Sequence, residues 1–225
     1  PRVRRQRQMC IRDSYYDNMT VSELLADRLP VTVMLAVISL LMILVCSVPL
    51  GLLCARGAGG VLDHLVNQIL QTVMAVPSFF LGILLTYAFG LVLHWFQPGQ
   101  FIEPSESFWG AVSYLIFPAM AVALPKIAMV VKFLRNAVLS EMSRDYVRTA
   151  RSRGNSSRRI LYVHVLKNAM IPVITFTAMV VAEILAGSII VEQVFSVPGV
   201  GRLLISSIFN RDYPVVQLSL IHISE

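Results

Sequence analysis

Apolar residues form four long stretches of the chain, and these stretches contain almost no charged side chain. Residues 29–55 contain none, and as a helix rising about 1.5 Å per residue they are long enough to cross a bilayer core of about 30 Å. Residues 65–96, 108–131 and 169–191 have the same character. The pattern predicts four transmembrane helices and therefore an all-α integral membrane protein, a polytopic helical bundle.

Proline is expected to bend the second of these helices. The stretch 65–96 is longer than one span needs, and Pro77 interrupts it. Because proline removes an intrahelical hydrogen bond, we predict a kinked or tilted helix there. In the third stretch, Lys126 lies near the end, where we expect its long side chain to reach the lipid headgroups.

Composition favours a membrane protein over a soluble one. The chain is 56% hydrophobic and 14% charged, whereas soluble domains contain about 45–50% apolar and about 25% charged residues. The three cysteines have no metal-ligand or redox spacing, and the histidines lie in separate segments. No Walker A pattern occurs, so the chain is not expected to bind ATP by that route. We therefore expect no catalytic, cofactor or metal site.

Basic residues indicate the orientation in the membrane. Residues 132–167 contain nine Lys or Arg against two acids, whereas 97–107 contains two acids and no Lys or Arg. Cytoplasmic loops carry an excess of Lys and Arg, so 132–167 is predicted to face the cytoplasm. Alternation then places 56–64 inside and 15–28, 97–107 and 192–217 outside. The net charge of +6 thus reflects topology and not a nucleic-acid partner.

Both ends of the chain differ from the rest. Residues 1–14 contain five arginines without helical or strand periodicity, and the last residues stop where another span would begin. Both ends resemble translated sequencing-adapter sequence, so we expect 1–14 and 218–225 to be non-native tails around a membrane domain at 15–217. The alternative for the first segment is a basic juxtamembrane tail. One further helix is expected on each side, which makes four spans present of six.

A short helix, a turn and another helix are predicted between the third and fourth spans. From position 143 the chain reads SRDYVRTARSRGNSSRRILYVHVLKNAMIP. Val147, Ala150 and Gly154 fall on one helix face, and the small residues at 150 and 154 would let a partner's surface approach. Gly154 and Asn155 tolerate the left-handed conformation that ends helices, and one of the two following serines can cap the next helix. The alternative is that the arginines only set topology and bind anionic lipid.

This stretch resembles the cytoplasmic EAA loop of binding-protein-dependent ABC importers, in the form found in peptide and nickel permeases. The family pattern DYVRTARAKG, followed by H-x-L-x-N-A-x-x-P, is matched by DYVRTARSRG and HVLKNAMIP. Arg148-Thr149-Ala150, and Lys167 in place of proline, depart from the general EAA pattern but are usual in this branch. The segments PSFFLG, HWFQPGQ, VEQVFSVPGVGRLL and RDYPVVQ also resemble the first permease subunit of such systems, so the resemblance covers 15–217.

The resemblance implies a type I ABC importer permease in a bacterial or archaeal cytoplasmic (inner) membrane. It implies a heterodimer with a second permease, two cytoplasmic ATPase subunits that bind the ATP, and an extracytoplasmic solute-binding protein. The solute would be a peptide or a related small solute, with nickel as one alternative, and the binding protein would choose it. The residues expected to couple to the ATPase are Asp145, Tyr146, Arg148, Thr149, Ala150, Arg151 and Gly154.

Glu183 lies within the fourth predicted span. A carboxylate at the bilayer centre costs about 2.5–3.5 kcal/mol, so we expect it to face the bundle interior or a water-filled path. It would either line the pathway or hydrogen-bond to a neighbouring helix, and the second interpretation is slightly favoured. With the break at Pro77, Glu183 also supports an alternative function, an ion-coupled secondary transporter. A third alternative is a membrane anchor that recruits a soluble partner through 132–167.

Overall fold

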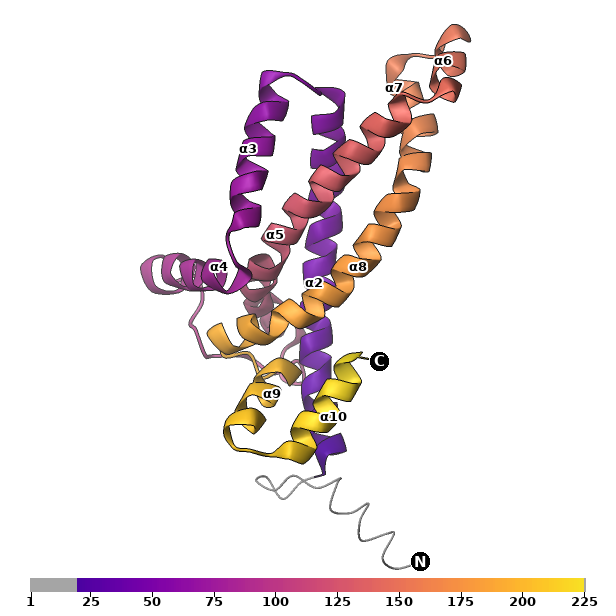
Figure 1. Ribbon diagram of the computed structural model, residues 1–225. Helices are drawn as coiled ribbons and strands as arrows, with labels where there is room; N and C mark the ends of the chain where they lie inside the picture. The colour runs from indigo at the N-terminus through magenta and orange to yellow at the C-terminus, as the bar shows by residue number, and fades with distance from the viewer. Residues whose placement is uncertain (1–19, 225) are drawn as a thin grey trace, which may run out of the picture.

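The computed structural model describes residues 20–224, which form helices joined by turns and by one longer loop at 93–107, with no β-strand among them (Figure 1). The predicted tail at 1–14 lies outside the described residues, whereas 218–224 form the end of the last helix. In chain order the helical elements are α2 (Val21–Arg56), α3 (Val61–Ala75), α4 (Ser78–Leu85), η1 (Thr86–Val92), α5 (Phe108–Met142), α6 (Asp145–Ser152), α7 (Ser157–Arg159), η2 (Ile160–Val165), α8 (Leu166–Val194), α9 (Val200–Phe209) and α10 (Tyr213–Ser224).

Within residues 20–224, three helices are long and apolar enough to cross a membrane: α2, α5, and the continuous helix Ser157–Val194 that α7, η2 and α8 form. Their lengths are 36, 35 and 38 residues. The predicted all-α membrane fold is confirmed. The span count is three, or four if the bent pair of α3 and α4 makes one span, so the predicted four spans match only the second count.

The second apolar stretch forms two helices and not one. The chain breaks between Ala75 and Ser78, and the two arms are bent by 97°. Pro77 lies in this break because it has no N–H to continue the first arm. The predicted interruption is confirmed, but the bend is far larger than a tilt, and α4 projects sideways from the bundle (Figure 1).

The long helices extend beyond the apolar stretches that predicted them. The first turn of α2 is a capping box, in which Thr20 N donates to Glu23 Oε2 at 3.2 Å and Glu23 N donates to Thr20 Oγ1 at 3.4 Å. At the other end of the bundle, α5 continues to Met142. The first part of the predicted loop 132–167 is therefore the end of a long helix, because polar residues can continue a helix past the lipid boundary.

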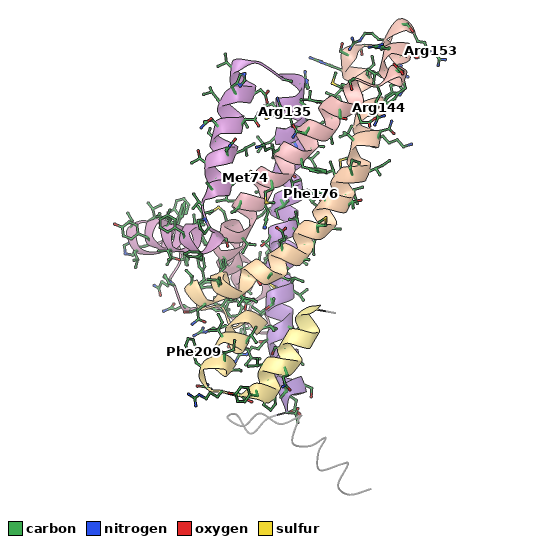
Figure 2. The ribbon with its side chains drawn as sticks, viewed as in Figure 1. Met74, Arg135, Arg144, Arg153, Phe176 and Phe209 are labelled. Carbon is green, nitrogen blue, oxygen red and sulfur yellow. The ribbon has the colours of Figure 1, made fainter. Side chains whose placement is uncertain are left out.

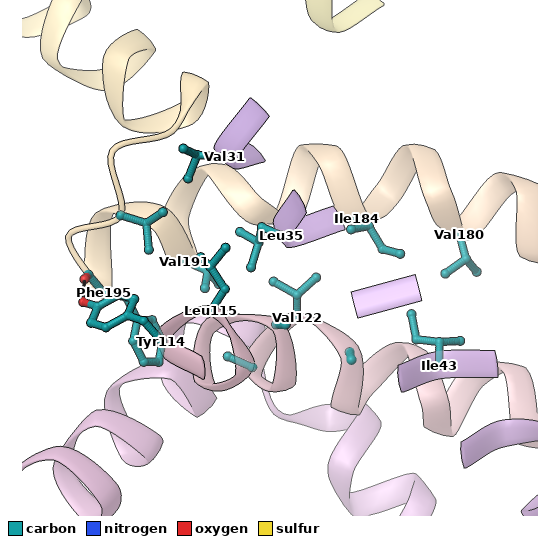
Figure 3. Close-up of a cluster of buried hydrophobic side chains, with 14 of the residues drawn as sticks. Val31, Leu35, Ile43, Tyr114, Leu115, Val122, Val180, Ile184, Val191 and Phe195 are labelled. Carbon is teal, nitrogen blue, oxygen red and sulfur yellow. Dashed lines mark hydrogen bonds between the residues drawn. The ribbon is translucent and has the colours of Figure 1, made fainter. Parts of the chain in front are cut away.

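The main apolar core lies where α2, α5 and α8 pack together (Figure 3). Leu35 from α2, Leu115 from α5 and Ile184 from α8 are among its fully buried side chains. Further along the same helices, α2 and α5 approach so closely at Gly51 that an added Cβ would lie 2.8 Å from Leu134 Cδ2. Close packing of this kind fixes the positions of the two helices relative to each other.

The two ends of the bundle carry different elements. The α6–α7 segment lies at one end, and α9 and α10 lie at the other, beside the first turns of α2 (Figure 1). Val21, Leu24 and Leu25 of α2 are buried in a cluster with Val200 of α9 and Val215 of α10. Contacts near the start and the end of the described chain therefore close one end of the bundle.

Candidate functional site

The predicted turn around Gly154 is present and ends α6. Gly154 has φ +77°, Asn155 N donates to Ala150 O at 3.4 Å, and Gly154 N donates to Arg151 O at 3.0 Å. These two hydrogen bonds form a Schellman motif, in which glycine carries the left-handed conformation without a Cβ penalty. Ser156 then caps the next helix by accepting from Arg159 N at 3.4 Å. The predicted helix–turn–helix is confirmed.

One face of α6 packs against the chain's own helices. Val147 is buried in a cluster formed with the neighbouring ends of α2, α5, η2 and α8, and Tyr146 and Ala150 pack against that cluster. The helix face of Val147, Ala150 and Gly154, which was predicted to meet a partner, is therefore only partly available to one. Val147 faces the bundle because it is apolar, Ala150 lies at the edge of the packed surface, and Gly154 lies in the exposed turn.

Tyr146 joins α6 to the end of α5. Its hydroxyl donates to Glu141 Oε2 at 2.8 Å, and the side chain is half-buried. Burial raises the pKa of Tyr146, and the hydrogen bond to the Glu141 carboxylate acts in the same direction, while a hydrogen bond with Asn168 opposes it. The phenol thus stays protonated and keeps its role as donor.

The remaining predicted coupling residues are exposed at the tip of the molecule. Asp145, Arg148, Thr149 and Arg151 all lie on the outer side of α6. Arg148 and Asp145 are 3.9 Å apart with side chains 84% and 97% exposed, so their pairing adds little stability. These residues and the neighbouring exposed arginines form a surface that we term the basic cap. It lies at the end of the molecule where Figure 2 labels Arg144 and Arg153. The arginines of the basic cap are Arg144, Arg148, Arg151, Arg153, Arg158 and Arg159.

Asp63 and Arg135 form an ion pair that sequence reasoning missed. Arg135 Nε donates to Asp63 Oδ1 at 2.7 Å and Arg135 Nη2 donates to Asp63 Oδ2 at 2.5 Å. Asp63 is 1% exposed, and Gly59 N and Asn67 Nδ2 also donate to it at 3.0 and 2.8 Å. This bidentate pair fastens the α2–α3 turn to α5. The one signal in the sequence was an isolated acid at the start of an apolar stretch.

Lys126 and Glu183 form an ion pair between α5 and α8. The prediction that Lys126 reaches the headgroups is wrong, because α5 continues to Met142 and Lys126 lies near the middle of that helix. Glu183 pairs with a neighbouring helix, as the favoured interpretation expected. Its side chain is nevertheless 50% exposed, and that of Lys126 is 20% exposed.

Glu192 is a second feature that sequence reasoning missed. It is fully buried, and its carboxylate accepts from Thr32 Oγ1 at 2.8 Å and from Arg202 N at 3.1 Å. Val200 N in turn donates to Thr32 Oγ1 at 2.9 Å. The carboxylate thus lies at the N-terminus of α9, where the helix dipole and free N–H groups favour an anion.

Glycine is required beside Glu192. A Cβ on Gly199 would lie 2.4 Å from Glu192 Cδ, and a Cβ on Gly201 would lie 2.5 Å from Ile189 Cα. Pro198 and Gly199 lead into α9, whose first residues are Val200 and Gly201, so this segment lies against the buried carboxylate. In residues 20–224, no three His, Cys, Asp or Glu side chains gather closely enough to hold a metal ion.

Comparison with known proteins matches residues 47–224 to a family described as "Binding-protein-dependent transport system inner membrane component". The chain is 34% identical over 198 residues to the oligopeptide transport system permease protein AppB of Bacillus subtilis, which covers 87% of this chain and 63% of AppB. It is 32% identical over 206 residues to the dipeptide transport system permease protein DppB of Lactococcus lactis, covering 92% of this chain and 65% of DppB. A putative peptide transport system permease protein of Brucella suis is 35% identical over 204 residues, covering 91% of this chain and 65% of that relative.

The chain therefore spans a little under two thirds of the length of these relatives. The matches and the apolar helices agree on the location of the protein. It is a multi-pass protein of the inner membrane.

Proposed function

This chain belongs to the family of binding-protein-dependent transport system inner membrane components, and from that premise we propose that it is a permease subunit of an ATP-driven importer. Its fold is that of a type I importer permease. The proposed solutes are peptides, because the relatives are named for oligopeptide and dipeptide transport. The proposed partners are a second permease, two cytoplasmic ATPases that bind the ATP, and an extracytoplasmic solute-binding protein. The chain itself is proposed to hydrolyse nothing.

The observation that carries this proposal is the packed helical unit under the basic cap. Val147 fixes α6 in a cluster with α2, α5, η2 and α8, and Tyr146 ties it to the end of α5. Because η2 continues directly into α8, a force on α6 is transmitted to two spanning helices. An ATPase that moved α6 as it closed would therefore change the angle between α5 and α8. Differential contacts in two such states are what coupling requires.

The exposed arginines supply the outer surface for that contact. Their side chains are exposed at the tip of the molecule, where Figure 2 labels Arg144 and Arg153. Arginine forms planar, bidentate hydrogen bonds with the carboxylates of a partner. In this proposal Arg148 and Arg151 contact the ATPase, while Gly154 allows the close turn between the two short helices.

Substitution of Gly154 tests the proposal. An added Cβ would meet no atom within 4 Å, so a larger side chain changes the backbone at φ +77° and the docking surface, and not the packing inside the chain. We expect Gly154→Val to abolish ATP-dependent peptide uptake at normal membrane expression, since a β-branched residue strongly disfavours this conformation. Gly154→Asn is the matched control and should retain most uptake, because asparagine adopts the left-handed conformation readily. Normal uptake by Gly154→Val would refute the docking role.

The main competing function is an ion-coupled secondary transporter. Its proposed ion site was Glu183, but that carboxylate is already neutralised by Lys126. Uptake by cells that lack the ATPase subunits separates the two functions. An importer should lose uptake, whereas a secondary transporter should keep it until the proton gradient is collapsed.

A further inference from the structure

Three of the acidic side chains within the helices, Asp63, Glu183 and Glu192, have very different surroundings. Glu192 and Asp63 are 0% and 1% exposed, and each accepts hydrogen bonds from several donors. Glu183 is 50% exposed, and Lys126 is its one hydrogen-bond donor within residues 20–224. The first two carboxylates are thus built into the fold, whereas Glu183 keeps an oxygen and half of its surface available.

The Lys126–Glu183 pair lies at membrane depth. No other charged residue occurs in α5 between Phe108 and Val131, or in α8 between Asn168 and Val191. Ionised side chains at such depth face a bundle interior or a water-filled cavity, because contact with lipid is costly. The partly exposed Lys126–Glu183 pair therefore identifies the surface of α5 and α8 that faces water or another subunit.

The register of α5 and α8 fixes where this pair lies. Two helical turns from the ion pair toward the basic cap, Phe133 and Phe176 stack with ring centroids 4.3 Å apart and an interplanar angle of 9°. Figure 2 shows Phe176 where α8 runs beside α5. The ion pair and the aromatic pair thus belong to one contact line between antiparallel helices. An ion pair in such a defined position can open by side-chain rotation without separating the helices.

We propose that the Lys126–Glu183 pair is a contact site for the charged termini of a peptide in transit, an inference that rests on the proposed import function. The α-ammonium of the peptide replaces Lys126 as the partner of Glu183, and the α-carboxylate replaces Glu183 as the partner of Lys126. No net charge is added to the membrane interior by this exchange, so a zwitterion enters at lower cost than a singly charged solute. The closed pair then re-forms and releases the peptide, which a transport path requires.

Cysteine accessibility tests the location of this site in the complex with the second permease, the ATPases and the solute-binding protein, reconstituted in proteoliposomes. The three native cysteines are first replaced by serine. Met179 lies one turn from Glu183, and Ile174 lies about 140° from Met179 around α8. The two are matched in exposure, at 63% and 61%. We expect Met179→Cys to react with a charged, membrane-impermeant thiol reagent and Ile174→Cys to remain unlabelled.

Peptide protection tests the chemistry. Alanyl-alanine should slow the labelling of Met179→Cys by about tenfold, the effect of one favourable charged contact. N-acetyl-alanyl-alanine amide, which lacks both terminal charges, should leave the rate unchanged. The additional change Glu183→Gln conserves side-chain size and should abolish the protection by alanyl-alanine.

Three results would overturn the site: equal labelling of the two cysteines, equal protection by the two peptides, or full protection with Glu183→Gln. ATP-dependent uptake of alanyl-alanine by the unsubstituted complex is measured in the same vesicles. Uptake with one of those three results overturns the site and leaves the proposed function intact. The expected protection pattern without any uptake overturns the proposed function and supports the site.

Discussion

Replacing Glu192 with alanine removes the acceptor that holds the start of α9. Thr32 Oγ1 and Arg202 N would then lose a partner inside a fully buried site. Each unsatisfied buried donor costs about 1–3 kcal/mol, so we expect Glu192→Ala to destabilise the region by about 2–6 kcal/mol. Glu192→Gln keeps the side-chain volume and one acceptor oxygen, but an NH₂ group replaces the other oxygen and cannot accept a hydrogen bond. We expect that variant to cost about 1–3 kcal/mol.

Hydrogen exchange at the start of α9 measures this effect directly. The amide of Arg202 is protected through its hydrogen bond to Glu192, so its exchange should accelerate by at least about tenfold for each 1.4 kcal/mol lost locally. Glu106→Ala is the matched control, because Glu106 is an exposed glutamate on the loop before α5, and exchange should not change. If Glu192→Ala left the exchange of Arg202 as in the unsubstituted protein, the assignment of Glu192 as the anchor of α9 would be wrong.

Two further predictions concern the other polar contacts of the bundle. Asp63→Ala leaves Arg135 without its carboxylate partner, so we expect a loss of about 3–5 kcal/mol, seen as a lower thermal unfolding temperature in detergent; an unchanged temperature would show that the pair contributes nothing. Tyr146→Phe removes the hydrogen bond to Glu141, and we expect it to destabilise α6 by about 0.5–1.5 kcal/mol. Because the pKa of Tyr146 is raised from 10.0, its stabilising effect is present below that ordinary value and lost as pH rises through the raised one. In the unsubstituted protein, the amides of α6 should therefore lose protection from hydrogen exchange at alkaline pH, and this loss should be smaller in Tyr146→Phe. Identical pH profiles for the two proteins would contradict this role of Tyr146.

Much of the architecture follows from local pattern. The lengths of the apolar stretches predicted the spanning helices, since a helix must satisfy its backbone hydrogen bonds within lipid. Pro77 and Gly154 were found because each has a backbone property that no neighbour can supply: a missing N–H in one case and easy access to positive φ in the other. These features depend on residues a few positions apart, and sequence reasoning captures such distances well.

Polar contacts inside the bundle depended on tertiary structure. Thr32 and Glu192 are 160 residues apart, and Asp63 and Arg135 are 72 apart, so no local periodicity connects them. The apolar stretch that contains Lys126 ends near this residue and so predicts a headgroup contact, whereas the helix continues to Met142. By itself, the sequence predicted the spanning helices and the turn at Gly154, both of which the structure contains. Only the packing of α2, α5, α8 and α9 decided which charges are buried, paired or exposed, because those states depend on which helix faces lie opposite one another.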